Sequence, residues 1–200
     1  ILRRKSGIHL SGADFKPERS ALGEILSIGI PVMMQDGFIQ VSFMIITIIA
    51  NHRGLIDSAA VGIVEKIISA MFIVPSSMLA TVSALSSQNL GAGKPERAAQ
   101  TLKYAAMIAT GYGIAVVLVI ELVAEPLLGC FTTDAAVVLM GCQYIRGYIV
   151  DTIFAGIHFC FSGYFCAYGL SGISFMHNLA AIICARIPIA YLASRQYPDT

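Results

Sequence analysis

The sequence predicts an all-α membrane protein, folded as a polytopic bundle of helices. Its composition is the first indication: of 200 residues, 56% are hydrophobic and 12% are charged, against about a quarter charged in an average soluble domain. The second is a charge-free run from Ile67 to Gly93, longer than the roughly 20 residues that a helix needs to cross a bilayer. Continuous apolar stretches such as residues 44–49 lack the alternation of outer-membrane strands, so the spans are expected to be helical.

Five spans are expected from the apolar stretches, about residues 22–50, 59–87, 98–124, 137–166 and 171–194. Lys and Arg gather in residues 1–21 and around the junction from Gly91 to Lys103, whereas the loop at 51–58 carries only Arg53. The positive-inside rule therefore predicts a multi-pass protein of the cell membrane (inner or plasma) with both basic segments in the cytoplasm.

The junction after the second span resembles a nucleotide-binding loop only superficially. A phosphate loop needs Gly five residues before its Gly-Lys pair and Ser or Thr after it, but Gln88 and Pro95 stand at these places. We expect a joint between helices instead, in which Gly91 and Gly93 close the second span and Pro95 begins the third.

The first span carries Asp36, the sharpest candidate for a functional residue. It lies twelve residues after Glu24, about 18 Å along the helix and close to mid-membrane. Asp36, Gln40, Phe43 and Thr47 recur at i, i+4, i+7 and i+11, which places them on one helical face. Because an acid in lipid is costly, Asp36 and Gln40 are candidates to line a cavity or bind a coupling cation; a structural hydrogen bond is the alternative.

The second span carries Glu65, which shares a face with Ser69, Phe72 and Ser76 at the same spacing. Glu65 lies nearer the outer surface than Asp36 and is a second cavity or cation-coupling candidate. Pro75 is expected to kink this helix.

The fourth and fifth spans carry three further ionisable candidates. If these spans form a hairpin that turns near Gly169, Asp151 and Arg186 lie at nearly equal depth, and a structural ion pair is expected. His158 lies seven residues after Asp151 on the same face. It is either a proton relay or a histidine satisfied by a neighbouring backbone carbonyl.

Several other kinds of protein are excluded or disfavoured. The motifs H-E-x-x-H and G-x-S-x-G do not occur, so no enzyme is expected. The cysteines form no C-x-x-C pair, so we expect no metal site, no cofactor and reduced core thiols. A net charge of +1 gives no indication of nucleic-acid binding. The five cysteines are Cys130, Cys142, Cys160, Cys166 and Cys184.

The order of these features resembles one lobe of a multidrug and toxic compound extrusion (MATE) transporter. The resemblance is carried by Ile30-Pro31 near the start of a span, by Gly62 and Glu65 early in the next, and by the run from Gln88 to Ala98 after it. Gly163-Tyr164 and Arg186-Ile187-Pro188 fit the same pattern. It extends over about residues 15–200 and is closest to the second, C-terminal lobe of the DinF-like branch.

The resemblance implies a two-lobe secondary antiporter that exports organic cations and drugs by alternating access, with Na⁺ or H⁺ as the coupling ion. Residues 1–21 would be the cytoplasmic linker between lobes, and residues 22–200 would supply about five of six helices of the second lobe. The chain begins with Ile1 and is expected to be a fragment. Its partners would then be the missing N-terminal lobe, small amphiphilic or cationic substrates and membrane lipid.

Two features of the resemblance leave alternatives open. In NorM-like relatives a coupling acid precedes a glycine by twelve residues, as Asp151 precedes Gly163, yet their partner acid would fall on Ile39 here. Asp151 is therefore either a cation-coupling residue or the partner of Arg186. The alternative functions are a flippase for lipid-linked precursors of the same superfamily and a membrane scaffold without transport.

Overall fold

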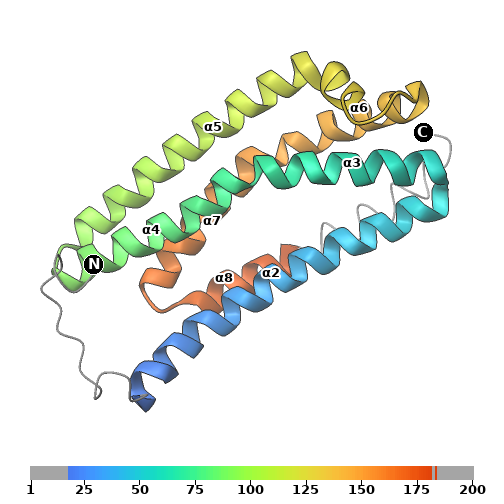
Figure 1. The fold of residues 1–200 in the computed structure, drawn as a ribbon. Coiled ribbons are helices and arrows are strands. Elements are labelled where there is room, and N and C mark those ends of the chain that lie inside the picture. Colours follow the sequence, from blue (N-terminus) through green and yellow to red (C-terminus); the bar gives the residue numbers. More distant parts are fainter. Residues whose placement is uncertain (1–17, 182, 184–200) are drawn as a thin grey trace, which may run out of the picture.

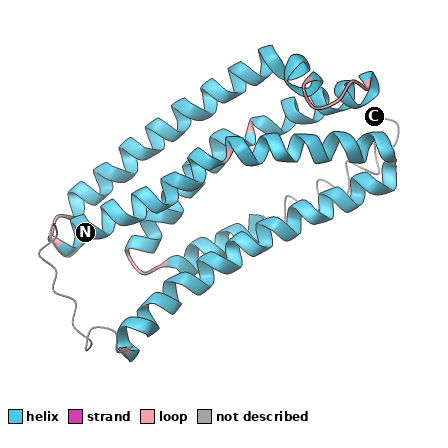
Figure 2. Cartoon of the chain, viewed as in Figure 1, coloured by secondary structure: helices cyan, strands magenta, loops and turns pink. Residues whose placement is uncertain are grey.

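The computed structural model describes residues 18–181 and 183, and every regular element in this part is a helix (Figures 1 and 2). Four stretches are long and apolar enough to cross a membrane: Ile25–Arg53, Leu55–Gly91, Pro95–Gly129 and Ala135–Ala167. The predicted all-α membrane bundle is confirmed. The helices are α2 (Arg19–Arg53), α3 (Leu55–Met71), α4 (Ile73–Gly91), α5 (Pro95–Gly129), α6 (Ala135–Ile149), α7 (Asp151–Ala167) and α8 (Ser171–Ala181).

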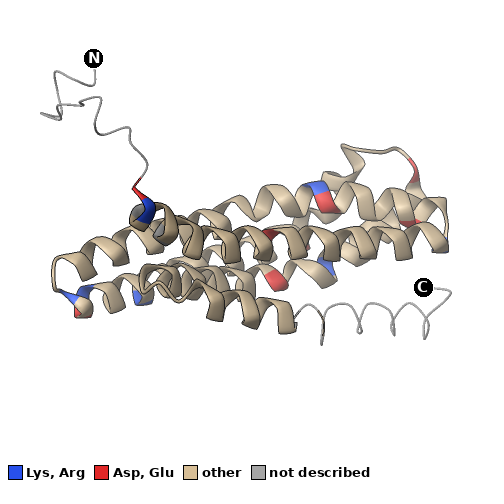
Figure 3. Cartoon of the chain, turned by 90° about the horizontal axis from the view of Figure 1, so that it is seen from below, with Lys and Arg blue, Asp and Glu red and all other residues tan. Residues whose placement is uncertain are grey.

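The helices run roughly along one direction, with chain turns at the two ends of the bundle (Figure 1). The α4–α5 loop, the α7–α8 turn and the start of α2 lie at one end, and the α2–α3 and α5–α6 connections lie at the other. Most of the helical surface between these ends carries no charge (Figure 3). This distribution suits a lipid-covered middle and polar ends.

The joint between the second and third spans has the predicted order of residues, but only Gly93, and not Gly91, takes the left-handed conformation expected of both. Helix α4 ends at Gly91, and Gly93 takes a left-handed φ of 70°, which glycine adopts without a steric penalty. The backbone N–H groups of Gly93 and Lys94 donate to the carbonyls of Leu90 and Asn89, both at 2.9 Å. Pro95 then begins α5, where its missing N–H is not needed.

The second span is interrupted at Phe72, between α3 and α4. Pro75 has no N–H to donate to the carbonyl of Met71, four residues earlier, and its ring crowds that carbonyl. The Met71 carbonyl accepts a hydrogen bond from the Tyr112 hydroxyl of α5 instead, at 2.9 Å. Because a backbone carbonyl in lipid has no water to bond, Tyr112 satisfies the group that the kink releases.

The fourth span is interrupted at Val150, between α6 and α7. Both interruptions lie beside the same part of α5. The Tyr112 hydroxyl donates to the Met71 carbonyl at the end of α3, and Gly113 lies against Ile153 near the start of α7. A Cβ added to Gly113 would lie 2.8 Å from the Ile153 Cα. Helix α5 itself passes this level without a break.

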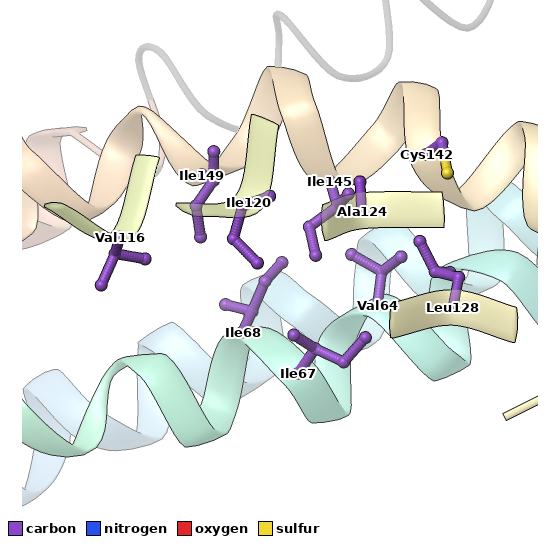
Figure 4. Close-up of a cluster of buried hydrophobic side chains, with 10 residues drawn as sticks. All are labelled: Val64, Ile67, Ile68, Val116, Ile120, Ala124, Leu128, Cys142, Ile145 and Ile149. Atoms are coloured by element: carbon purple, nitrogen blue, oxygen red, sulfur yellow. The ribbon is translucent and has the colours of Figure 1, made fainter. Parts of the chain in front are cut away.

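Buried apolar side chains form two clusters, one on each side of the level at which the second and fourth spans are interrupted. The larger cluster joins α3, α5 and α6 (Figure 4), and the smaller one joins α4, α5 and α7. Neither cluster contains a side chain from α2 or α8. Helices α3 to α7 therefore share an apolar core, and α2 and α8 lie together beside it (Figure 1). The larger cluster consists of Val64, Ile67, Ile68, Val116, Ile120, Ala124, Leu128, Cys142, Ile145 and Ile149.

Helix α7 contacts α4 and α5 through glycines. A Cβ added to Gly163 would collide with the Leu79 carbonyl and lie 3.2 Å from the Leu79 Cα, and one added to Gly156 would lie 3.2 Å from the Ala109 Cβ. Small residues at such places let helix backbones approach closely, which favours association in membranes.

Substituting Gly163 tests the close α4–α7 contact. We expect Gly163→Ala to lower the stability of the purified protein by about 1–3 kcal/mol, because the new methyl group must displace backbone. The matched control is Gly147→Ala on α6, where a Cβ would meet nothing within 4 Å. Thermal unfolding in detergent measures the difference, and equal melting temperatures for the two variants would contradict the observed packing.

The Tyr112 hydroxyl provides a second test. We expect Tyr112→Phe to destabilise the protein by about 1–2 kcal/mol, because the Met71 carbonyl loses its donor. Tyr104→Phe, on an exposed part of the same helix, is the control. In a Pro75→Ala background the backbone N–H of residue 75 can replace the hydroxyl, so the effect of Tyr112→Phe should shrink. An undiminished effect would show that the hydroxyl acts elsewhere.

Candidate functional site

Polar side chains join α2 and α8 to the rest of the bundle, together with a ring contact between Phe43 of α2 and Tyr148 of α6. The contacts run from α2 to α3 at one place and from α2 through α8 to α7 at another. Polar groups inside a membrane are costly and usually face protein or a hydrated cavity, so this region is the candidate functional site. We call it the polar seam, and it consists of Gln35, Thr47, Glu65, His158, Ser162, Ser174 and His177.

The first contact of the polar seam joins the two faces that were predicted separately on the first and second spans. The hydroxyl of Thr47 on α2 donates to Glu65 Oε1 on α3 at 3.0 Å, and it also lies 3.1 Å from the Phe43 carbonyl. The Phe43 ring packs 6.1 Å, centroid to centroid, from that of Tyr148 on α6. Glu65 is therefore held at the point where α2 meets the apolar core.

The second contact joins α2, α8 and α7 through three buried side chains. The Ser174 hydroxyl of α8 donates to Gln35 Oε1 at 3.2 Å and shares a short hydrogen bond with the Ser162 hydroxyl of α7. Gln35 is only 2% exposed, and its amide nitrogen has no hydrogen-bond partner. A buried amide N–H without a partner leaves a donor free for water or a ligand oxygen.

The third contact pairs two histidines one helical turn further along. The rings of His158 on α7 and His177 on α8 stack with their centroids 5.3 Å apart and their planes 24° from parallel. His158 Nε2 is buried without a hydrogen-bond partner. The expected bond from His158 to a neighbouring carbonyl is therefore not seen at this nitrogen.

The Asp36 and Gln40 side chains are exposed on α2, whereas the adjacent Gln35 is buried. Neighbouring helix positions point about 100° apart, so burying residue 35 against α8 turns residue 36 away from it. Their predicted roles in a cavity or in cation coupling are neither supported nor contradicted by these positions. The Ser69 and Ser76 hydroxyls, predicted to share the Glu65 face, donate to the carbonyls four residues earlier in their own helix.

Asp151 lies exposed in the first turn of α7, just after the break at Val150. A carboxylate at this place is favoured by the positive end of the helix dipole. Arg186, its predicted ion-pair partner, lies outside the described residues, so the pair stays a prediction. Two ion pairs are seen elsewhere, Arg53–Asp57 at 2.9 Å and Arg146–Glu121 at 3.5 Å.

No group of three His, Cys, Asp or Glu side chains suited to a metal ion is found among residues 18–181 and 183. Cys142, Cys160 and Cys166 are buried as free thiols, in agreement with the predicted core role. Cys130 is free but exposed at the end of α5, so it is not a core residue. Cys184 lies outside the described part of the chain.

Sequence reasoning missed Gln35, Ser174 and His177. Gln35 was overlooked because the adjacent Asp36 carries the more costly charge, and His177 because it lies near the start of an apolar stretch. The available signal was spacing: residues 158 and 162 lie one turn apart on α7, and residues 174 and 177 lie one turn apart on α8. Only the pairing of the two helices shows that these spacings face each other.

The model of the MatE family matches residues 31–192, most of this chain. A comparison with curated protein sequences gave no match. The matched region begins within α2 and includes α3 to α8, with both the break at Phe72 and the polar seam. The extent of this match and the helices of membrane-spanning length agree that the chain belongs to the MatE family of multi-pass membrane transporters.

Proposed function

We propose that this chain forms most of one lobe of a secondary antiporter that exports organic cations and drugs in exchange for Na⁺ or H⁺. The observation that carries the proposal is the hydrogen bond from Thr47 to Glu65, which places a carboxylate at the contact between α2 and the apolar core. A carboxylate at such a place neutralises its charge by binding a cation, and intramembrane acids commonly mark ion pathways.

The arrangement of the helices supports alternating access. Helices α2 and α8 contribute no side chain to either apolar cluster, so a shift of this pair breaks polar contacts and the Phe43–Tyr148 ring contact but leaves both clusters in place. Hydrogen bonds between membrane helices contribute about 0.6 kcal/mol on average. Two arrangements of α2 and α8 can therefore lie close in free energy, which an exchange cycle requires.

The complete transporter includes a second lobe, which would close the cavity on the side where Asp36 and Gln40 are exposed. In this arrangement Asp36 faces the substrate pathway and Glu65 lies deeper, at the Thr47 contact. Asp151 is a further candidate for cation coupling. The basic end of the bundle, with the α4–α5 loop and the start of α2, would lie in the cytoplasm of a cell with the protein in its inner or plasma membrane.

The residues that a lipid-linked precursor would need receive no such support. Within the described helices, Arg146 lies in an exposed ion pair with Glu121 and makes no contact with the polar seam. A flippase of this architecture would need basic side chains inside the cavity to bind a phosphate.

Removing the Thr47 hydroxyl tests the Glu65 site. We expect Thr47→Val to slow gradient-driven efflux of a fluorescent organic cation about threefold to tenfold, because a hydrogen bond between membrane helices contributes about 0.6 kcal/mol on average and about 1.7 kcal/mol at most. Thr47→Ser should retain most of the rate, because serine keeps the hydroxyl. Thr81→Val is the control, since Thr81 is exposed and donates to its own helix. The site would be rejected if Thr47→Val and Thr81→Val transported equally well.

Asp36 is tested in cells that express the complete transporter. Asp36→Asn should lower resistance to cationic drugs towards that of cells without the transporter, with protein amount in the membrane unchanged. The control is Asp134→Asn, because this exposed residue caps α6 and asparagine caps a helix equally well. Unchanged resistance in Asp36→Asn would remove Asp36 from the substrate pathway.

A further inference from the structure

The antiparallel helices α7 and α8 meet through two pairs of polar side chains, which we call the two rungs. Ser162 and Ser174 make the first rung through their hydroxyls, and His158 and His177 make the second through their stacked rings. A leucine or phenylalanine at these four places would pack two membrane helices without any desolvation cost. The presence of two histidines therefore calls for a role besides helix packing.

A hollow of about 330 Å³ lies beside the histidine rung. It gives the buried His158 Nε2 a neighbouring space that can hold water, and the Ser162 and Ser174 hydroxyls line the same space. Water held by the hydroxyls and imidazoles of this otherwise aromatic hollow would provide the hydrogen-bonded path by which a proton reaches the buried His158 Nε2. The hollow is lined by Phe154, Ile157, His158, Phe161, Ser162, Phe165, Ser174 and His177.

The titratable groups around the histidines differ between the neighbouring helices. Helix α8 contributes His177, α4 has no titratable residue, and α6 contributes Tyr144, Tyr148 and Arg146 at the far side of the Val150 break. On α5, Tyr112 is bonded to Met71, and Lys103 and Tyr104 are exposed. Helix α2 contributes the exposed Asp36, and α7 itself contributes Asp151, Cys160, Tyr164 and Cys166. No carboxylate lines the hollow itself.

We propose that the stacked pair of His158 and His177 binds the coupling proton of this lobe and holds one proton, never two. This inference rests on the proposed antiport and selects H⁺ as the ion that the pair takes up. Imidazole nitrogens bind protons near neutral pH, whereas Na⁺, as a hard cation, prefers oxygen ligands. A second positive charge 5.3 Å from the first is opposed by Coulomb repulsion, which the burial of His158 Nε2 strengthens.

Counting protons tests the shared site directly. The purified complete transporter is titrated between about pH 8 and pH 5 in weak buffer, and bound protons are compared among variants. We expect the unaltered protein, His158→Gln and His177→Gln to take up equal numbers, since either ring alone can hold the proton. The double variant His158→Gln/His177→Gln should take up one proton fewer.

Three other results would overturn the proposal. Equal uptake by all four proteins would show that neither histidine binds a proton, and stepwise loss of one proton in each single variant would show two independent sites. A loss in only one single variant would assign the proton to one residue. The control His52→Gln, at the exposed end of α2, should leave transport unaffected.

A transport assay distinguishes failure of the histidine site from failure of the proposed antiport. Proteoliposomes with the complete transporter receive a pH gradient or a sodium gradient, and ethidium movement is followed by fluorescence. We expect the double variant to lose at least about nine tenths of pH-driven movement while it still binds ethidium, and His52→Gln to retain full movement.

The other outcomes of the transport assay contradict either the antiport or the histidine site. No gradient-driven movement in the unaltered protein would refute the antiport itself. Normal pH-driven movement in the double variant, or movement driven by sodium alone in the unaltered protein, would refute only the histidine site. Loss of ethidium binding together with transport in the double variant would indicate a structural role for the histidines and would also count against the proposal.

Discussion

The close contact of α7 with α4 and α5 is the constraint on which the rest of the bundle depends. Lipid is as apolar as leucine, so helices in a membrane gain little from the hydrophobic effect and associate through close van der Waals contact instead. Gly163 against Leu79, Gly156 against Ala109 and Gly113 against Ile153 provide that contact along the whole length of α7. The two apolar clusters form around this axis because α5 passes both of them as one helix.

The position of α2 and α8 follows from which helix surfaces remain free after α7 has packed against α4 and α5. The close-packed faces of α4, α5 and α7 contact one another. Helices α2 and α8 therefore contact the core through polar side chains and the Phe43–Tyr148 ring contact. Such contacts specify a position because their geometry is directional, yet each contributes little net stability. The position of α2 and α8 is therefore well defined, yet changing it costs little free energy. A moving part of a transporter needs this combination.

Composition and span length were sufficient to predict the fold class, because the bilayer imposes a length and an apolar surface on every crossing helix. The helix joint at Gly93 and Pro95 was also predictable, since its chemistry is local. The break at Val150 was not, because no proline lies near it.

The site residues show the same division between local and tertiary information. Helical spacing placed Thr47 and Glu65 on the correct faces of their own helices, and the structure brings those faces together. Helical spacing could not show which of Gln35 and Asp36 is buried, because that depends on which side of α2 packs against α8. For the same reason the sequence did not identify the α8 ring that stacks on His158, which also contacts the Phe159 ring of its own helix.

The two candidate ion sites lie on opposite sides of the level where the second and fourth spans are broken. Glu65 belongs to α3, before the Phe72 break, and His158 belongs to α7, after the Val150 break. Helix α2 contacts both sides as one helix, through Thr47 at the first and Gln35 at the second. In the proposed exchange cycle, a bend of the core at this level would strain one of these contacts if α2 moved as one helix. Such a relation between the sites is the physical requirement for coupling an ion at one to movement at the other.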